Sequence, residues 1–103
     1  MSDAGRRKIL GLLGLGLRGR LAVVGVQQVR DAAKRGKLKI ALVASDASQN
    51  SLDKFRGLLA ARAVPVIDIF SAAELGTATG REAVAVVGVT DAGLAEGIQE
   101  VVF

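Results

Sequence analysis

The chain has 103 residues, the size of one domain, and half of them are apolar while 23% are charged. This balance is typical of a globular protein and excludes a disordered one. Because the sequence contains no cysteine and no histidine, it excludes disulfides, thiolate chemistry and any site built on histidine. We expect residues 1–103 to form a single domain.

The basic residues are concentrated in the first part of the chain. Residues 1–39 carry ten Lys and Arg against two Asp, a balance of +8, whereas residues 40–103 carry a balance of −4. Such an asymmetry predicts a polyanionic partner, usually nucleic acid or an anionic membrane. No apolar run approaches the ~18 residues that a membrane span needs. Arg18 and Arg20 also stand where a signal peptide would need small residues for cleavage, so we expect a cytoplasmic protein with no membrane partner.

Apolar residues recur at helical spacing in some segments and run without interruption in others, so helices and strands are expected to alternate. In the first helix the glycines Gly11, Gly14 and Gly16 leave two interpretations open, a poor helix or very close neighbours. The predicted elements are a helix at 4–18, a strand at 21–24, a helix at 26–35, a strand at 40–44, a turn at 45–48, a helix at 51–62, a strand at 66–69, a short helix capped by Ser71, a loop at 76–80, a strand at 83–89 and a helix from 90 to about 100.

The strands are apolar throughout and are flanked by helices. A strand of this kind is buried on both of its faces, which requires helices on both sides of the sheet. The sequence therefore predicts an α/β fold with the three-layer α/β/α sandwich architecture.

Residues that could carry out catalysis are missing or isolated. The serines have only Lys or carboxylates as bases, the acids are scattered, and no phosphate-binding glycine motif follows a strand. We therefore predict a protein that is not an enzyme and that has no cofactor and no metal site. Asp46 follows a buried strand, where it is either a helix cap or part of a small-ligand site.

A nucleic-acid site is the best supported of the functional alternatives. Gly25 ends a strand and opens a helix, and the free N–H groups at the start of a helix favour phosphate. Gln27 and Gln28 lie in the first turn and offer donors and acceptors to base edges. With only three phenylalanines and no other aromatic residue, stacking on single strands is disfavoured. The cations that flank the turn and its helix are Arg18, Arg20, Lys34 and Lys37.

Six segments in the same order resemble a known family. They are residues 7–15 (RKILGLLGL), 25–37 with the start GVQQV, 42–48 (LVASDAS), 64–66 (VPV), 74–80 (ELGTATG) and 87–91 (VGVTD). Together they resemble the superfamily of kink-turn RNA-binding ribosomal proteins that includes L7Ae and L30e, and within it the bacterial YlxQ-like members.

The resemblance implies a mixed four-stranded sheet in the α/β/α sandwich and a structured RNA partner, a kink-turn or a related bent duplex. It also implies association with the ribosomal or transcription machinery. In such proteins the turn into the second helix and the loop after the Leu-Gly motif form one RNA surface. Gly25 would allow close backbone approach, and Gln27 and Gln28 would occupy base-contacting positions. The residues expected to pack against the extruded RNA strand are Leu75, Gly76, Thr77, Ala78 and Thr79.

One position departs from the family pattern. Asp31 stands where strong kink-turn binders usually carry Lys, and a carboxylate there repels phosphate and cannot donate to guanine acceptors. The sequence therefore leaves a second hypothesis open, a protein-interaction or structural domain of the same fold with weakened or lost RNA binding.

Overall fold

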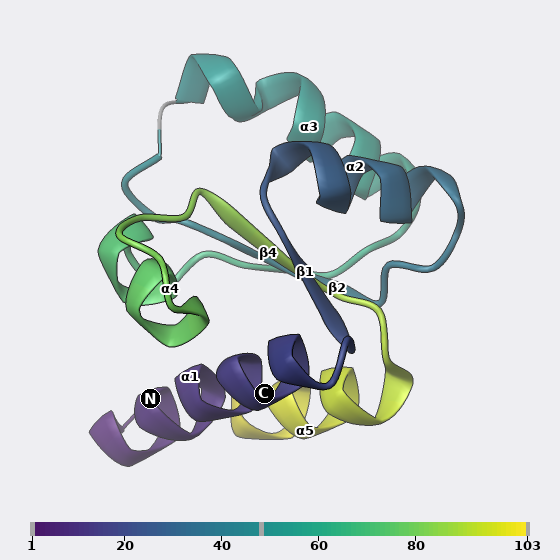
Figure 1. Cartoon of the computed structure of the whole chain (residues 1–103). Coiled ribbons are helices and arrows are strands. Elements are labelled where there is room, and N and C mark those ends of the chain that lie inside the picture. The colour runs from purple at the N-terminus through teal and green to yellow at the C-terminus, as the bar shows by residue number, and fades with distance from the viewer. Residues whose placement is uncertain (1, 48, 103) are drawn as a thin grey trace.

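The computed structural model describes residues 2–47 and 49–102, with the side chains of residues 49–51 and 54 left out. Its helices and strands alternate as predicted (Figure 1). None of the helices in this part of the chain is long and apolar enough to cross a membrane. The elements are α1 (Asp3–Arg18), β1 (Ala22–Val24), α2 (Val26–Lys34), β2 (Ile40–Val43), α3 (Gln49–Ala61), β3 (Val66–Ile67), α4 (Ala72–Thr79), β4 (Val86–Val89) and α5 (Ala92–Val102).

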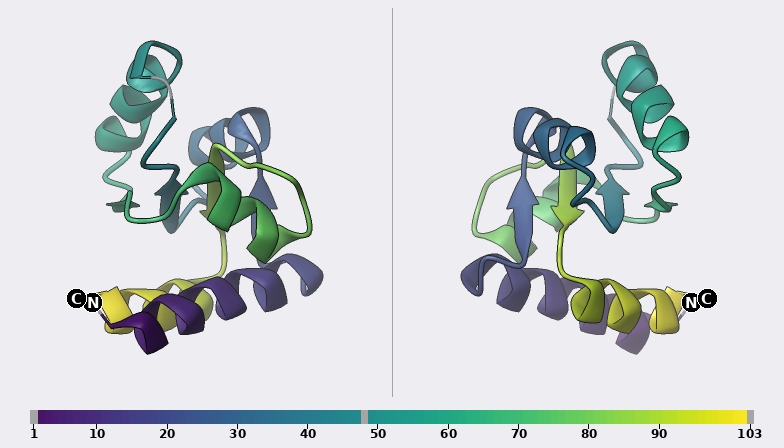
Figure 2. Two further views of the ribbon diagram at one scale, coloured as in Figure 1. Left: turned by 90° about the vertical axis from the view of Figure 1, so that its left-hand side faces the viewer. Right: turned by 90° about the vertical axis from the view of Figure 1, so that its right-hand side faces the viewer.

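The four strands form one mixed sheet in the order β1-β4-β2-β3. β4 pairs antiparallel with both β1 and β2, and β3 pairs parallel with β2. Helices α2 and α3 lie on one side of the sheet, whereas α1 and α5 form a layer on the other side (Figure 2). The predicted α/β/α sandwich with a mixed four-stranded sheet is confirmed.

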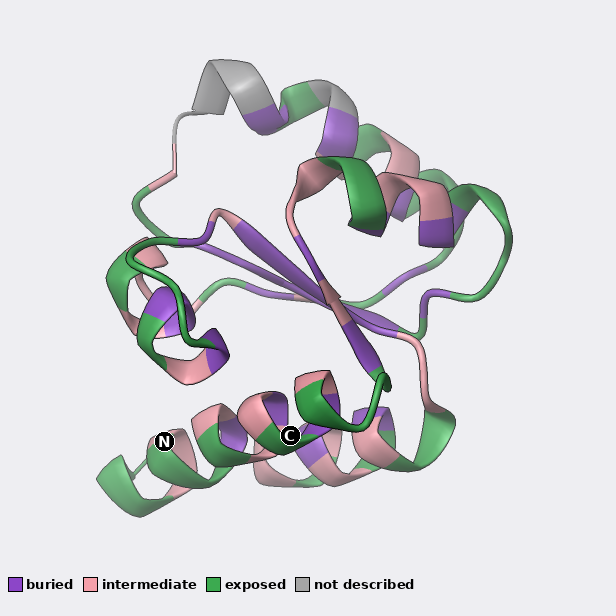
Figure 3. Ribbon diagram, in the orientation of Figure 1, coloured by how far each residue is buried: buried purple, intermediate pink, exposed green. Residues whose placement is uncertain are grey.

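Two apolar cores fill the spaces between the three layers. Successive strand residues point to opposite faces, so Ile40 and Leu42 pack with α1, α4 and α5, while Ala41 and Val43 pack with α2 and α3. All four strand residues are fully buried, as the continuous purple of the central strands illustrates (Figure 3). This double burial explains why the strands carry no polar residues.

The glycines of α1 permit close packing. A Cβ atom at Gly14 would lie 2.8 Å from the carbonyl oxygen of Ala78 in α4, and one at Gly16 would overlap the side chain of Leu94 in α5. α1 is nevertheless a continuous helix of 16 residues. Of the two interpretations of these glycines, close packing of α1 against neighbouring helices is therefore the correct one.

The strands are shorter than predicted at their ends. β1 begins at Ala22 instead of residue 21, β2 ends at Val43, β3 covers only Val66 and Ile67, and β4 begins at Val86 instead of residue 83. Before β4, the N–H of Val84 donates to the carbonyl of Ala72 in α4 at 3.0 Å, so this residue is bonded to a helix instead of to a neighbouring strand.

The predicted loop at residues 76–80 is wrong, because α4 continues through Thr79. The hydroxyls of Thr77 and Thr79 donate to the carbonyls of Ala73 (3.1 Å) and Leu75 (2.8 Å), one helical turn earlier. The helix ends at Gly80, whose φ of 75° is the left-handed conformation that glycine adopts at helix C-termini. The loop is therefore residues 80–85.

Asp46 is a helix cap, although not of the helix that follows it in sequence. Its Oδ1 accepts a hydrogen bond of 2.9 Å from the N–H of Ala72 at the start of α4. Ser71 caps the same helix with a reciprocal capping box to Glu74, as predicted. Ser48, the last residue of the predicted turn at 45–48, lies outside the described residues.

Gly76 provides a test of close backbone packing. Because a Cβ atom there would lie 2.7 Å from the carbonyl oxygen of Glu82 and 2.8 Å from the N–H nitrogen of Ala83, we expect Gly76→Ala to lower the free energy of unfolding by about 1–3 kcal/mol. Gly11→Ala is the matched control, since a Cβ meets nothing within 4 Å there, and it should raise stability by about 0.5–1 kcal/mol. Urea unfolding measures both, and equal effects of the two substitutions would contradict the packing described.

Candidate nucleic-acid interface

The turn from β1 into α2 presents a free helix N-terminus. Gly25 has a φ of 98°, a conformation that side chains disfavour, and its N–H donates to the carbonyl of Val86 at 3.0 Å. As the N-cap residue of α2, Gly25 has no side chain that could cap the helix. The first N–H groups of a helix have no partner within the helix, and such a helix start favours anions.

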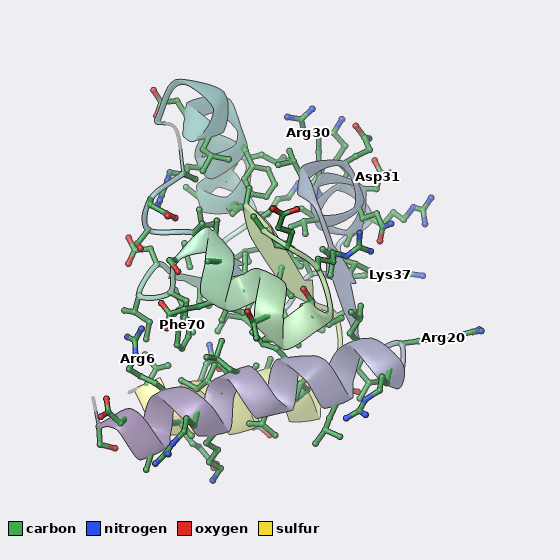
Figure 4. All side chains as sticks on the ribbon, turned by 60° about the vertical axis from the view of Figure 1, so that its left-hand side comes forward. Arg6, Arg20, Arg30, Asp31, Lys37 and Phe70 are labelled. Carbon is green, nitrogen blue, oxygen red and sulfur yellow. The ribbon has the colours of Figure 1, made fainter. Side chains whose placement is uncertain are left out.

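The first turn of α2 carries two exposed glutamines, one of which is held by an acid. The Nε2 of Gln27 donates to Oδ1 of Asp31 at 3.0 Å. This bond uses one of the two donors of the Gln27 amide, so its second N–H and its amide oxygen are left for a partner. Arg30 does not compensate for the negative charge, because it extends from α2 in a different direction from Asp31 (Figure 4).

Gln28 and Lys37 meet in one hollow of about 300 Å³ beside β1. Asp31 and Arg35 line it too, so two cations and one carboxylate face the same space. Lys34 is exposed but lies outside the lining. Arg35 belongs to the basic cluster of the sequence, and it follows Gln28 by seven residues, a helical spacing that places both on one face.

Arg18 and Arg20 lie at the other end of β1 from Gly25. The three-residue strand separates the two ends by about 10 Å. Arg18 lines a hollow of about 410 Å³ with Thr77, Ala78 and Thr79, between α1 and α4. Arg20 extends into solvent beyond the end of α1 (Figure 4). The predicted site residues therefore divide into two groups, one on α2 and one at α1 and α4.

Not every residue of the Leu-Gly segment reaches the surface. Leu75 is fully buried in the core and Gly76 packs against the backbone of residues 82 and 83, which corrects the expectation that these two contact RNA directly. Thr79 is 9% exposed, while Thr77 is exposed. Leu75 and Gly76 instead hold the loop that follows.

The loop of this region lies at residues 80–85 instead of the predicted 76–80, and its residues 80–83 are exposed. It begins at Gly80 and Arg81, and it ends at Val86, whose carbonyl is bonded to Gly25. The loop therefore comes to lie beside the start of α2 (Figures 1 and 2). Arg81 was missed as a candidate, and the signal that identifies it is Gly80 as the end of a helix.

An ion pair fixes the start of α4 relative to α1. Arg6 donates to both carboxylate oxygens of Glu74, at 3.2 and 2.9 Å, and to the carbonyl of Ile69. Its guanidinium also lies 4.8 Å from the ring centre of Phe70. The N–H of Ser71 and then Arg6 hold the pKa of Glu74 below its usual value. The contacts that hold the start of α4 against α1 therefore depend on the ionised carboxylate of Glu74.

These features define an α/β/α domain with basic residues near a helix start that lacks a side-chain cap. The model of the ribosomal protein L7Ae/L30e/S12e/Gadd45 family matches residues 7–99. The chain belongs to this family. Because the proteins of this family bind RNA and are not enzymes, the prediction of a protein without catalytic activity is confirmed.

Similar proteins agree with this assignment. The chain is 30% identical over 102 residues to the RNA-binding protein YlxQ of Enterococcus faecium, covering 99% of this chain and 98% of that protein. It is 38% identical over 84 residues to the RNA-binding protein YlxQ of Bacillus subtilis (strain 168), covering 82% and 84%. These relatives confirm the YlxQ-like resemblance.

Solved structures match the fold. A protein of unknown function from Bacillus halodurans superposes with a TM-score of 0.85 at 30% identity, covering 92% of this chain and 96% of that one. The 15.5kD RNA binding protein of Giardia lamblia superposes with a TM-score of 0.79 at 20% identity, covering 99% and 88%. The second likeness supports the fold alone.

The ion pair between Arg6 of α1 and Glu74 of α4 predicts that the stability of the protein depends on pH. A carboxyl with a lowered pKa in the folded state stabilises the protein above its unfolded pKa, and this contribution is lost as pH falls through the folded pKa. We expect Glu74→Gln to unfold at lower urea than the parent at pH 7, and the difference to shrink below pH of about 4.3. Glu96→Gln, an exposed position on α5, is the control. A difference that is constant from pH 7 to pH 3 would show that the ion pair does not contribute.

Proposed function

We propose that the chain is a non-catalytic RNA-binding protein whose RNA is a kink-turn or a related bent duplex. The RNA-binding surface that we propose consists of the start of α2 and the loop at residues 80–85. The observation that carries the proposal is the uncapped N-terminus of α2 at Gly25, directly beside the end of this loop. The names of the two YlxQ relatives support RNA as the ligand.

The chemistry of this surface suits a folded duplex better than a single strand. The α2 N–H groups favour a phosphate, and Arg35 and Lys37 beside Gln28 favour further phosphates. Gln28 offers a donor and an acceptor to a base edge. Phe55 and Phe70 are buried, at 0% and 1% exposure, so neither offers a platform on which an unpaired base could stack.

The cellular setting that we propose follows from the family. Its name joins several ribosomal proteins, which supports association with the ribosomal or transcription machinery in the cytoplasm.

Asp31 favours a second candidate function, a protein-interaction domain of the same fold with weakened RNA binding. Its carboxylate stands between Gln27 and the cations of the hollow, and a phosphate there would be repelled. An RNA-free purified protein that holds a protein partner at high salt would favour this second function.

A binding comparison tests the proposed RNA class. A kink-turn RNA and an unkinked duplex of equal length and composition are titrated with the protein, and fluorescence anisotropy is recorded. We expect tighter binding to the kink-turn, and an affinity that falls as salt rises because counterions are released. Equal affinity for both RNAs would refute recognition of the bend, and absence of binding would favour the second function.

A charge reversal tests the orientation of α2. Asp31→Lys replaces a repulsive carboxylate with a cation, so we expect tighter binding to the kink-turn by about tenfold, equivalent to about 1.4 kcal/mol. Asp53→Lys on α3 is the matched control, because it makes the same charge change at an exposed position of another helix. Equal gains from both variants would indicate unspecific attraction and would contradict RNA contact by this face of α2.

A further inference from the structure

A second surface feature lies apart from α2, between α1 and α4. Two hollows of about 550 and 410 Å³ share Gly14, Arg18, Thr77 and Ala78, so they form one groove. The groove runs from Leu10 and Ala73 to the end of α4 at Thr79 and Gly80. Figure 4 shows α4 lying along α1 on this side of the molecule. No residue of α2 lines the groove, and Gly80 is the one residue of the loop at 80–85 in its lining, so most of the groove lies outside the proposed RNA surface.

The floor of the groove is apolar and made of small residues. Gly14 brings the two helices close, since a Cβ there would lie 2.8 Å from the carbonyl oxygen of Ala78. One turn earlier, at Gly11, a Cβ would meet nothing within 4 Å, so the groove is open above this residue. Leu10 lies half-buried beside it and Ala73 faces it from α4. The open space next to Leu10 would admit an apolar side chain of a partner.

The charge around the groove is positive. The acid in its lining is Glu74, which is already paired with Arg6. Arg18 is exposed in the lining and makes no ion pair with any described residue. Arg7 is also exposed, and its spacing from Gly11, Gly14 and Arg18 places all four on one face of α1. The apolar floor therefore has a cation towards each end.

We propose that the groove between α1 and α4 binds an acidic segment of a partner protein, in which an apolar side chain lies between two carboxylates. The apolar side chain occupies the space above Gly11, and the carboxylates pair with Arg7 and Arg18. The two arginines are 11 residues apart, about 16 Å along a helix. An extended chain covers this distance in about five residues.

A peptide fits this groove better than RNA does. No aromatic ring among the described residues lines the groove, so none of them offers a base a stacking platform, whereas Leu10 and Ala78 suit an aliphatic side chain. The position of the groove, ending at Gly80 where the loop 80–85 begins, allows a protein to bind next to the RNA surface without covering α2.

The probes are synthetic peptides with two glutamates five residues apart, with Leu, Ile, Val, Met or Phe midway and glycines elsewhere. Each is added up to millimolar concentration to the isotope-labelled full chain, and backbone amide shifts are recorded. We expect saturable shifts in residues 10–18 and 73–80 and none in residues 25–31. The same peptides with lysines in place of glutamates should bind at least tenfold more weakly. Equal binding of both sets, or no saturable shift with any peptide, would overturn the proposal.

Gly11 allows the groove to be filled without disturbing the fold. Gly11→Leu should remove the peptide-induced shifts, while Gly11→Ala should retain them within a factor of about two; thermal unfolding checks that both variants are folded. Kink-turn RNA binding should be the same in both variants, which separates this proposal from the proposed function. If Gly11→Leu binds the peptides as the parent does, or if the RNA rather than the peptides shifts residues 10–18, the proposal is wrong.

Discussion

The architecture depends on two places where backbone meets backbone without an intervening side chain. Gly14 of α1 approaches the carbonyl of Ala78, and Gly76 of α4 approaches the backbone of residues 82 and 83. α4 is thereby held between α1 and the loop that follows it. Because that loop ends at Val86, which accepts the N–H of Gly25, the packing of α4 determines what lies beside the start of α2. The proposed RNA surface is therefore a consequence of helix packing.

The charges are arranged by this packing in a way that their number alone does not reveal. The +8 balance of residues 1–39 suggests a single basic face. In the fold, Arg6 forms an ion pair with Glu74, Arg18 faces α4, and Lys37 lies beside Gln28. Asp31 interrupts the basic character of α2 and binds Gln27. The basic residues therefore lie in at least three separate places, and one of these, the ion pair of Arg6 with Glu74, is structural.

Local signals predicted the fold well, because most elements here follow local rules. Continuous apolar runs identified the buried strands, Ser71 and Glu74 identified the capping box, and Gly25 identified the turn into α2. The prediction failed where a contact between distant parts of the chain decides the local structure. α4 continues through residues 76–79 and packs there on α1, where Gly14 lets the carbonyl of Ala78 approach closely, and glycine and threonine in a short segment do not suggest this contact between distant parts of the chain.

The same limit applies to the candidate site. Gly25 and the two glutamines could be identified in sequence because a helix start has a recognisable pattern. The neighbourhood of Arg18 could not, since it depends on α4, an element elsewhere in the chain. Asp46 shows the difference most clearly, because it caps α4, 26 residues away, instead of the helix that follows it.

In the proposed function, the start of α2 and the loop at residues 80–85 act as one RNA surface. Mapping of the amide shifts of the isotope-labelled chain with a kink-turn RNA is the sharpest test. We expect residues 25–28 and 80–85 to shift together, with the same dependence on RNA concentration. Shifts confined to other surfaces, or shifts in only one of the two segments, would contradict it.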